Sequence, residues 1–320
     1  MKAIILGILA SLFFALTFIL NRAMELSGGS WIWSAVLRYV FMIPFLLLIV
    51  FLRGNLKDLF LDMKAKPFIW LKWSTVGFGL FYAPLCFAAA YGPSWLVASM
   101  WQVTIVAGSL LVPFFYQIVE TPQGIRKVRQ SIPIKGLIFS LVILAGIVIM
   151  QVEQLENLST KQMVLGISPV VLAAFAYPLG NRKMMVFCGN NLDAYQRVLG
   201  MTLASIPFWL ILSIYGYGTV GIPSFPQTIQ TLLVAISSGV IATVLFFSAT
   251  DISKNDVHKL AAVEATQSGE VVFSLVGEIF LLNGKLPSNL SFTGMVIVIG
   301  GMLLHSFSAK ETNKEIKRNN

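Results

Sequence analysis

Apolar runs long enough to cross a membrane recur along this 320-residue chain. A helix needs about 20 predominantly apolar residues to span the hydrocarbon core of a bilayer. Hydrophobic residues make up 57% of the chain and charged residues 12%, which leaves too few polar side chains to cover a water-soluble domain. The sequence therefore predicts an all-α membrane protein. We expect ten transmembrane helices, at approximately 2–20, 31–52, 68–90, 94–117, 134–151, 163–187, 195–216, 228–250, 258–282 and 290–308.

The basic residues predict how the chain is oriented in the membrane. The net charge of +9 would suit nucleic-acid binding, but the Lys and Arg residues fall mainly in short connections between apolar runs. Such a distribution is typical of the positive-inside rule. With the N-terminus inside, the outer connections hold only Arg22, Lys161 and Lys285, whereas Arg182 and Lys183 join the cytoplasmic side. We predict a multi-pass protein of the cytoplasmic (inner) membrane, with both termini cytoplasmic and no nucleic-acid partner.

The two halves of the chain repeat one another. An Asn-Arg-x-Met sequence occurs at 21–24 and again at 181–184, and an arginine follows in the next span each time, Arg38 and Arg197. Residues 97–102 align loosely with 262–267. This pattern predicts a five-helix repeat at 1–151, a second at 160–310 and a basic cytoplasmic tail at 311–320. An odd number of spans per repeat inverts the second copy, and inverted repeats in transporters enclose a central cavity near the membrane midplane.

Three carboxylates lie in the ninth predicted span, and a helix would place Glu264, Glu270 and Glu278 on one face together with Gln267. Each ionised carboxylate near the bilayer centre costs about 3 kcal/mol on insertion scales. One interpretation is a polar seam along a solute path, in which Glu270 couples protons or binds a cation. The alternative is that these acids only fix helix packing. For Glu264 the competing account is a salt bridge to Arg197 or Lys259, and for Glu278 it is an interfacial structural role.

Other polar and aromatic side chains inside the spans are weaker candidates. Aromatic faces attract desolvated cations by roughly 1–2 kcal/mol, and an aromatic pocket could bind lipophilic cations, although most aromatic residues in spans serve packing. Asparagines there join helices more often than they bind ligands. Single arginines inside spans either pair with the acids or reach the interface. These candidates are Tyr82, Trp101, Gln102 and Tyr177 for the pocket, Asn21 and Asn181, and the charge partners Arg38 and Arg197.

Motifs of soluble enzymes and metal sites do not occur in the sequence. There is no G-x-x-x-x-G-K-[ST] and no H-E-x-x-H, and the only histidines, His258 and His305, are far apart. A Ser-His-Asp arrangement cannot be recognised either. We therefore expect no enzyme activity, no cofactor and no metal. Because one chain contains both repeats, a monomer suffices for the predicted architecture. The sequence does not decide whether the protein also forms a dimer.

The ninth and tenth spans resemble those of the drug/metabolite transporter superfamily in its ten-span, duplicated form. Members often show Glu-Pro, an apolar stretch, then Gly-Glu fourteen residues after the first acid, followed by a glycine-rich last span. Here Glu264 and 277–278 match that spacing, and glycines occur at 294, 300 and 301. Within the superfamily the chain looks most similar to bacterial multidrug-resistance efflux proteins. Two features depart from the pattern: Ala265 replaces the proline, which removes the usual cause of a helix break, and Glu270 is an additional acid.

The resemblance implies a secondary transporter that exports small amphipathic or cationic solutes by alternating access. Its partners would be a small-molecule solute, membrane lipid and, if transport is coupled, protons. Four-span relatives use a glutamate in the first span for proton antiport, whereas spans one and six here have no acid in their apolar cores. The resemblance therefore does not decide whether transport is coupled to protons. If it is, Glu270 is the first candidate proton carrier and Glu264 the second. The alternatives are an exporter or uncoupled facilitator of amino acids or other metabolites, a membrane-embedded enzyme, and a receptor.

Overall fold

The first half of the chain is a series of helices interrupted by short breaks and one hairpin. The computed structural model describes residues 1–319 except 92–93, 122–123, 156–158 and 282–287. The elements of this half are α1 (Lys2–Leu26), α2 (Trp31–Leu52), α3 (Leu56–Ala65), α4 (Pro67–Ser74), the π-helix η1 (Thr75–Gly79), α5 (Leu80–Tyr91), α6 (Ser94–Trp101), α7 (Val103–Leu110), the 3-10 turn η2 (Val112–Phe114), β1 (Tyr116–Thr121), β2 (Gly124–Arg129) and α8 (Ile134–Leu155).

In the second half, all the described regular elements are helices, joined by short connections. Its elements are α9 (Thr160–Cys188), α10 (Ala194–Ala204), α11 (Ile206–Val220), α12 (Phe225–Val234), the π-helix η3 (Ala235–Ala242), α13 (Thr243–Ser253), α14 (Val257–Ala265), the 3-10 turn η4 (Thr266–Ser268), α15 (Gly269–Leu281) and α16 (Asn289–Asn319). The last helix thus continues from the tenth predicted span into the basic tail.

Among the residues that the structure describes, five helices are long and apolar enough to cross a membrane: 2–21, 31–52, 67–91, 164–188 and 225–253. A sixth crossing results if α10 and α11, which meet at a bend of 42°, count as one broken span. Shorter apolar helices lie at 97–110, 134–150 and 289–305. The prediction of an all-α membrane protein with several apolar spans is therefore confirmed at this level.

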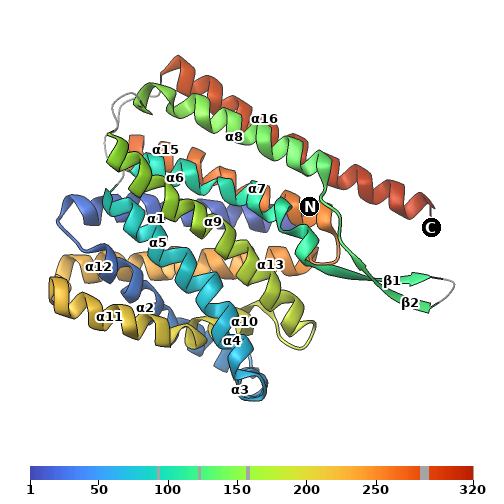
Figure 1. The fold of residues 1–320 in the computed structure, drawn as a ribbon, viewed down its shortest axis with the longest axis horizontal. Coiled ribbons are helices and arrows are strands. Elements are labelled where there is room, and N and C mark those ends of the chain that lie inside the picture. Colours follow the sequence, from blue (N-terminus) through green and yellow to red (C-terminus); the bar gives the residue numbers. More distant parts are fainter. Residues whose placement is uncertain (92–93, 122–123, 156–158, 282–287, 320) are drawn as a thin grey trace.

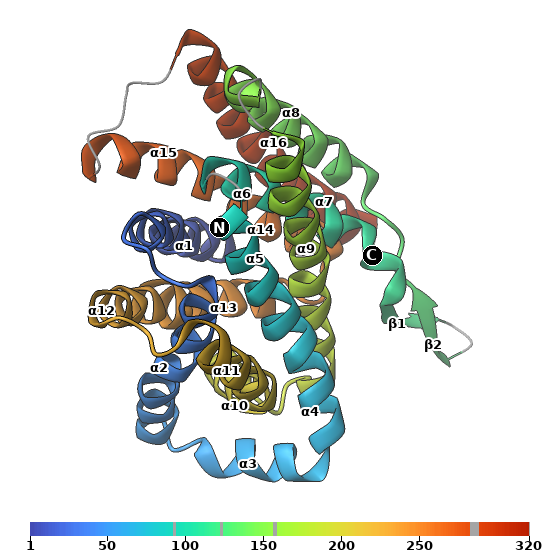
Figure 2. The ribbon, with the colours of Figure 1, turned by 60° about the vertical axis from the view of Figure 1, so that its left-hand side comes forward.

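The helices form one bundle in which α1 contacts helices of both halves. In Figures 1 and 2, α8 and α16 run side by side along one edge of the bundle, and Figure 2 shows α1 between α15 and α12. Helix α1 packs against α13 and α15, while α5 packs against α9. Helices from the two halves therefore alternate through the core instead of forming two separate bundles.

Two elements were not predicted from the sequence. A two-stranded antiparallel hairpin, β1–β2, with Tyr116 opposite Arg129, projects from the bundle beyond α7 (Figure 1). The predicted span at 94–117 is wrong at its end, because helix α7 stops at Leu110 and Pro113 sits in a 3-10 turn before the hairpin. Proline lacks a backbone N–H, so it favours such an ending. Helix α3 lies in the connection between α2 and α4.

Polar caps define where several helices begin. The Ser30 side chain accepts a hydrogen bond from the first turn of α2, and Asp256 caps α14 in the same way. At the start of α10, Asp193 and Gln196 form a reciprocal capping box. Such caps satisfy backbone N–H groups that would otherwise lack partners at a helix end. They keep the connections short and so fix which helices are neighbours.

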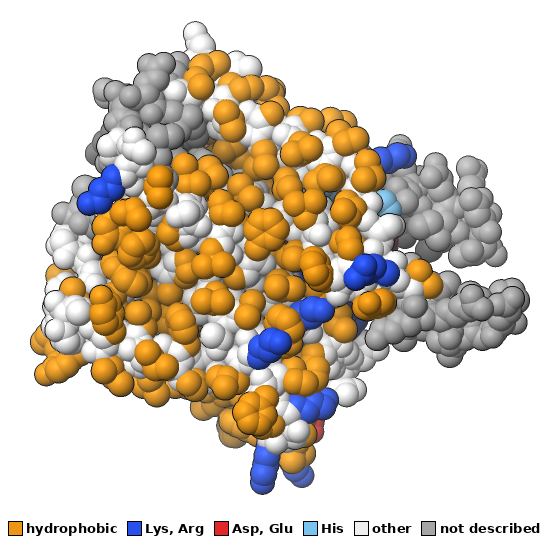
Figure 3. Space-filling model, in the orientation of Figure 1, with side chains coloured by type: hydrophobic (Ala, Val, Ile, Leu, Met, Phe, Trp, Pro, Cys, Tyr) orange, Lys and Arg blue, Asp and Glu red, His pale blue; other side chains and the backbone are white. Residues whose placement is uncertain are grey.

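The outer surface is apolar over a broad face. Figure 3 shows hydrophobic side chains over most of this face, with Lys and Arg gathered mainly toward its right-hand and lower parts. Large side chains such as Leu48, Phe51, Ile211 and Ile214 are more than half exposed. An apolar patch of this extent would be unusual on a soluble monomer, and it is what a surface facing lipid requires. The surface therefore supports a multi-pass membrane protein.

Candidate functional site: a buried charged pocket

The helix that carries the predicted acids is broken in its middle. Helix α14 ends at Ala265, a 3-10 turn spans 266–268, and α15 continues from Gly269. The helix is thus broken here although Ala265 replaces the family's proline. The hydroxyl of Thr266 donates to the carbonyl of Val263 at 2.6 Å, and that of Ser268 donates to the carbonyl of Ala265 at 2.7 Å. These bonds give polar partners to carbonyls at the break, so no proline is needed.

The break places Glu264 and Glu270 in different surroundings. Glu264 forms a bidentate ion pair with Arg182 of α9, with Nε–Oε1 at 2.8 Å and Nη2–Oε2 at 2.6 Å. The side chains are 5% and 3% exposed, respectively. Gly108 of α7 leaves room for this ion pair, because a Cβ at that position would overlap the Glu264 carboxylate. Glu264 therefore joins α9 to α14, and its partner is Arg182, not the predicted Arg197 or Lys259.

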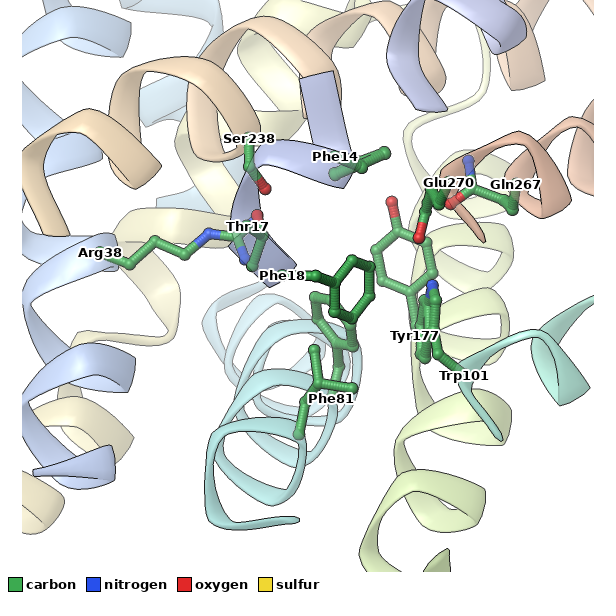
Figure 4. A pocket seen from close by; sticks show the side chains of 11 residues that line it. Phe14, Thr17, Phe18, Arg38, Phe81, Trp101, Tyr177, Ser238, Gln267 and Glu270 are labelled. Carbon is green, nitrogen blue, oxygen red and sulfur yellow. The ribbon is translucent and has the colours of Figure 1, made fainter. Parts of the chain in front are cut away.

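Glu270 instead lies on the wall of an internal pocket. Its side chain is fully enclosed, and its Oε1 has no hydrogen-bond partner in the part of the chain that the structure describes. The Trp101 side chain lies next to this carboxylate on the pocket wall (Figure 4). In Figure 4, Glu270 and Gln267 enter the pocket from one side and Arg38 enters from the other. The pocket has about 20 Å³ of free space, roughly enough for one water molecule.

Both halves of the chain contribute to this pocket. Its lining consists of Phe14, Thr17 and Phe18 from α1, Arg38 from α2, Phe81 and Leu85 from α5, Trp101 from α6, Tyr177 from α9, Ser238 from η3, Gln267 from η4, and Glu270 from α15. The lining elements η3 and η4 are π-helical and 3-10, respectively, and α6 and α15 each adjoin a break. Irregular turns of this kind often occur at functional sites.

Aromatic rings fill the space between the two charged sides. Phe81 contacts Tyr177 with ring centroids 4.6 Å apart and Trp101 at 5.0 Å. Tyr177 also stacks on Phe246 of α13 at 5.9 Å, and Phe246 meets Phe14 edge-on at 6.3 Å. The rings belong to α1, α5, α6, α9 and α13, so they form a continuous aromatic wall across the two halves.

Arg38 is the cation on the far side of the pocket from Glu270. It is 2% exposed and lies over the Tyr82 ring at 4.0 Å, but it has no carboxylate partner among the described residues. Its Nε lacks a hydrogen-bond partner there as well. Arg197, which the predicted repeat aligns with Arg38, is instead paired with Asp251 and donates to the Phe247 carbonyl at 3.2 Å. The two arginines therefore differ in their partners.

The structure brings together five of the predicted residues. Glu270, Gln267, Trp101, Tyr177 and Arg38 line the pocket, and Tyr82 lies directly beneath Arg38. The rest do not line this pocket. Gln102 is buried at the break between α6 and α7 and donates to the Ala98 carbonyl, Asn181 is buried in α9, and Asn21 lies in a separate small pocket beside Cys86. The Glu278 side chain lies outside the described residues.

Several pocket residues were missed from the sequence. Thr17, Phe81 and Ser238 carry no motif, and only the packing of three helices places them together. Arg182 gave a signal that was misread: it falls inside the predicted span 163–187, yet it was assigned to a cytoplasmic connection. Ionisable residues inside spans usually pair with one another or with backbone carbonyls, and Glu264 was available as a partner.

A larger hollow of about 560 Å³ lies beside α1, α14, α15 and α16. Its lining is almost entirely apolar, with residues such as Ile4, Ile8, Val272, Phe273 and Leu303. Few polar groups converge there, whereas the smaller pocket combines a carboxylate, a guanidinium and unpartnered hydroxyls. Specific sites need such convergent polar groups, so we place the candidate site at Glu270.

Comparison with known proteins identifies the family. Residues 1–311 match the family described as "EmrE: Putative multidrug resistance efflux transporter". The chain belongs to this family. It is 60% identical to "Uncharacterized protein YjlA" of Bacillus subtilis (strain 168) over 310 residues, which cover 97% of this chain and 96% of that protein. Membership in this multidrug efflux transporter family confirms the resemblance inferred from the ninth and tenth spans.

Two further comparisons extend this result. The chain is 50% identical over 270 residues to the "Uncharacterized 42.1 kDa protein in intracellular alkaline protease 3'region" of Shouchella clausii, covering 84% of this chain and 70% of that protein. A crystal structure titled "Crystal structure of protein" matches with a TM-score of 0.72 at 14% identity, over 97% of this chain and 98% of that one. At this identity the match concerns the fold alone.

Proposed function

We propose that this protein is a secondary transporter that exports small amphipathic or cationic solutes across the cytoplasmic membrane by alternating access. The observation that carries the proposal is the pocket in which Glu270, incompletely hydrogen-bonded, faces Arg38 across an aromatic wall. A buried carboxylate without full compensation is costly in an apolar bundle, and its retention is explained if solute or protons complete its coordination.

We further propose ten crossings in two inverted five-helix repeats, with both termini cytoplasmic. In support of this, irregular turns recur at matching places: π-helices at 75–79 and 235–242, and breaks at Gln102 and at 266–268. The packing is also reciprocal, since α5 of the third span contacts α9 of the sixth, and α13 of the eighth contacts α1 of the first. Reciprocal pairings of this kind are what a pseudo-twofold axis in the membrane plane produces.

The free volume of the pocket favours a closed conformation between the two access states. Sites for drug-sized ligands occupy roughly 300–1,000 Å³. The 20 Å³ found here would admit a solute only after the helices around it separate. The breaks at Gln102 and 266–268 lie next to the pocket, and they are the places where α6–α7 and α14–α15 can bend.

Proton coupling, if it operates, would use Glu270. Glu264 is a poor second carrier because Arg182 already saturates both of its oxygens. A proton exchanged at Glu270 would compete with a cationic group for the same carboxylate, and this competition is the basis of antiport. The driving force available is about 2.3 kcal/mol per charge per 100 mV.

The test is transport by the purified protein in proteoliposomes. We expect counterflow of a lipophilic cation such as tetraphenylphosphonium, and accelerated flux when a proton gradient is imposed. Flux that ignores the gradient would favour an uncoupled facilitator. Absence of exchange for cations, amino acids and other metabolites alike would reject the transporter proposal and return the membrane-embedded enzyme to consideration.

A further inference from the structure

The two charges of the central pocket are held apart, although they have opposite signs. Arg38 reaches in from α2 and Glu270 from α15, and Figure 4 shows aromatic side chains between them. Within the described part of the chain neither forms an ion pair with the other or with a third residue. In the same bundle, Arg182 and Glu264 are joined at 2.6 Å. Buried charges therefore pair directly elsewhere in this fold, whereas Arg38 and Glu270 in the pocket do not.

Unpartnered polar atoms gather at both ends of the pocket. Beside Arg38 are Thr17 Oγ1 and Ser238 Oγ, and beside Glu270 are Gln267 Nε2 and the Tyr177 hydroxyl (Figure 4). None of these four atoms has a hydrogen-bond partner among the described residues. Buried polar groups in native proteins are nearly always hydrogen-bonded. These four atoms are therefore available to hydrogen-bond a ligand in the pocket.

The chemistry of the two ends differs. The Arg38 end presents a guanidinium and two hydroxyls, all of which can donate, and this suits an anionic group such as a carboxylate. The Glu270 end presents a carboxylate and a tyrosine hydroxyl, which suits an ammonium group. A simple lipophilic cation would complete the Glu270 end and leave Arg38 buried without a partner.

We infer that the pocket binds a small zwitterion, with its ammonium group at Glu270, its carboxylate at Arg38 and an apolar or aromatic body against Phe81, Trp101 and Tyr177. This inference rests on the proposed transport function and narrows its substrate class. A zwitterion satisfies both ends in one molecule, and it replaces two uncompensated buried charges with two charge-assisted contacts. A compact zwitterion also requires less opening of the pocket than a drug-sized cation does.

Three compounds that share one aromatic ring test this inference: phenylalanine, phenethylamine and phenylpropionic acid. They carry both charges, only the ammonium and only the carboxylate, respectively. Binding is measured as the rise in melting temperature of the purified full-length protein, and exchange as counterflow in proteoliposomes. We expect phenylalanine to bind at least about tenfold more tightly than either singly charged analogue, because each lost contact is a charge-assisted hydrogen bond.

Variants assign the two ends. Arg38→Gln is expected to weaken phenylalanine binding about tenfold and to remove its advantage over phenethylamine, whereas Arg38→Lys retains part of it. Arg53→Gln is the matched control, since Arg53 pairs with Asp193 at the surface and lies outside the pocket. The wild-type comparison of the three compounds needs no variant, so it decides the question even if Arg38→Gln does not fold.

Two outcomes are distinguishable. If phenethylamine binds as tightly as phenylalanine to the wild-type protein, or if Arg38→Gln weakens both equally, the zwitterion inference is wrong and a cation transporter remains. If tetraphenylphosphonium and all three aromatic compounds fail to exchange, the transport function itself fails.

Discussion

Glu264 and Glu270 lie six positions apart in the sequence, on either side of one 3-10 turn, and both are buried. Glu264 has both oxygens bonded to Arg182, in a corner between α9, α14 and the glycine of α7. Glu270 has an oxygen without a partner and faces a pocket. The two glutamates are similarly buried, but Glu264 is bonded to another helix, whereas Glu270 is available to bind a ligand or a proton.

This contrast separates structural from functional charge. A buried ion pair that is complete contributes to a specific arrangement of helices, and breaking it leaves an uncompensated charge. A buried charge that lacks some of its hydrogen-bond or ion-pair partners lowers the stability of the fold, and only binding of a ligand or a proton restores it. The predictions below test whether the two acids divide in this way, from the largest expected effect to the smallest.

The largest effect is expected on stability at the Glu264 pair. Arg182→Leu should lower the free energy of unfolding by about 3–5 kcal/mol, because Glu264 is left buried and unpaired. The double variant Arg182→Leu/Glu264→Leu should recover most of this loss. Thermal melting in detergent measures both. A single variant as stable as the wild-type protein would show that the pair is not structural.

Glu270→Gln should have the opposite effect: it should impair transport and leave stability intact. The substitution removes a charge that costs about 3 kcal/mol in an apolar setting, so stability should be unchanged or higher. Solute exchange in proteoliposomes should fall by at least about a hundredfold, given the loss of a charged contact to the solute or proton. Retained exchange with unaltered proton dependence would remove Glu270 from the mechanism.

Gly108→Ala tests the fit around the structural pair. A methyl group there would overlap the Glu264 carboxylate, and we expect a loss of about 1–3 kcal/mol in stability from overpacking. Gly300→Ala in α16 is the control, because a Cβ at that position meets no atom within 4 Å. Equal melting temperatures for the two variants would contradict the tight approach of α7 to Glu264.

Trp101→Phe should have the smallest effect, and this effect should be limited to solute binding. It keeps an aromatic ring and removes the indole N–H from the pocket wall next to Glu270, so solute affinity should change by about tenfold with little loss of stability. Trp70→Phe is the matched control: it removes the indole bond to Asp62, 2.9 Å long, far from the pocket. If both variants alter solute affinity equally, the effect is not local to the pocket.

The sequence predicted an all-α membrane protein with several apolar spans, and its family, because length and hydropathy are local properties; the ten crossings stay a prediction. It also singled out Glu270, Gln267, Trp101, Tyr177 and Arg38, which line the candidate pocket, since polar or aromatic residues are conspicuous inside apolar runs. The partner of Glu264 could not be derived, because the pairing of α9 with α14 depends on tertiary packing. The break at 266–268 was missed for a different reason: hydroxyl side chains of Thr266 and Ser268 substitute for the proline that usually marks it.

The remaining residues of the pocket show the same limit. Thr17 and Ser238 are small hydroxyl residues in apolar helices, a common occurrence that gives no signal in sequence. Their importance arises only because η3 and α1 meet beside Arg38. The hairpin at 116–129 likewise follows from a proline turn after α7 and was hidden by the apolar residues that precede it.

The most direct test of the division between the two acids compares Glu264→Gln with Glu270→Gln in a single experiment: melting temperature with and without a transported solute. The account predicts that Glu264→Gln melts at a lower temperature and is still stabilised by solute, whereas Glu270→Gln melts at or above the wild-type temperature and is no longer stabilised. The reverse assignment, or equal behaviour of the two variants, would contradict it.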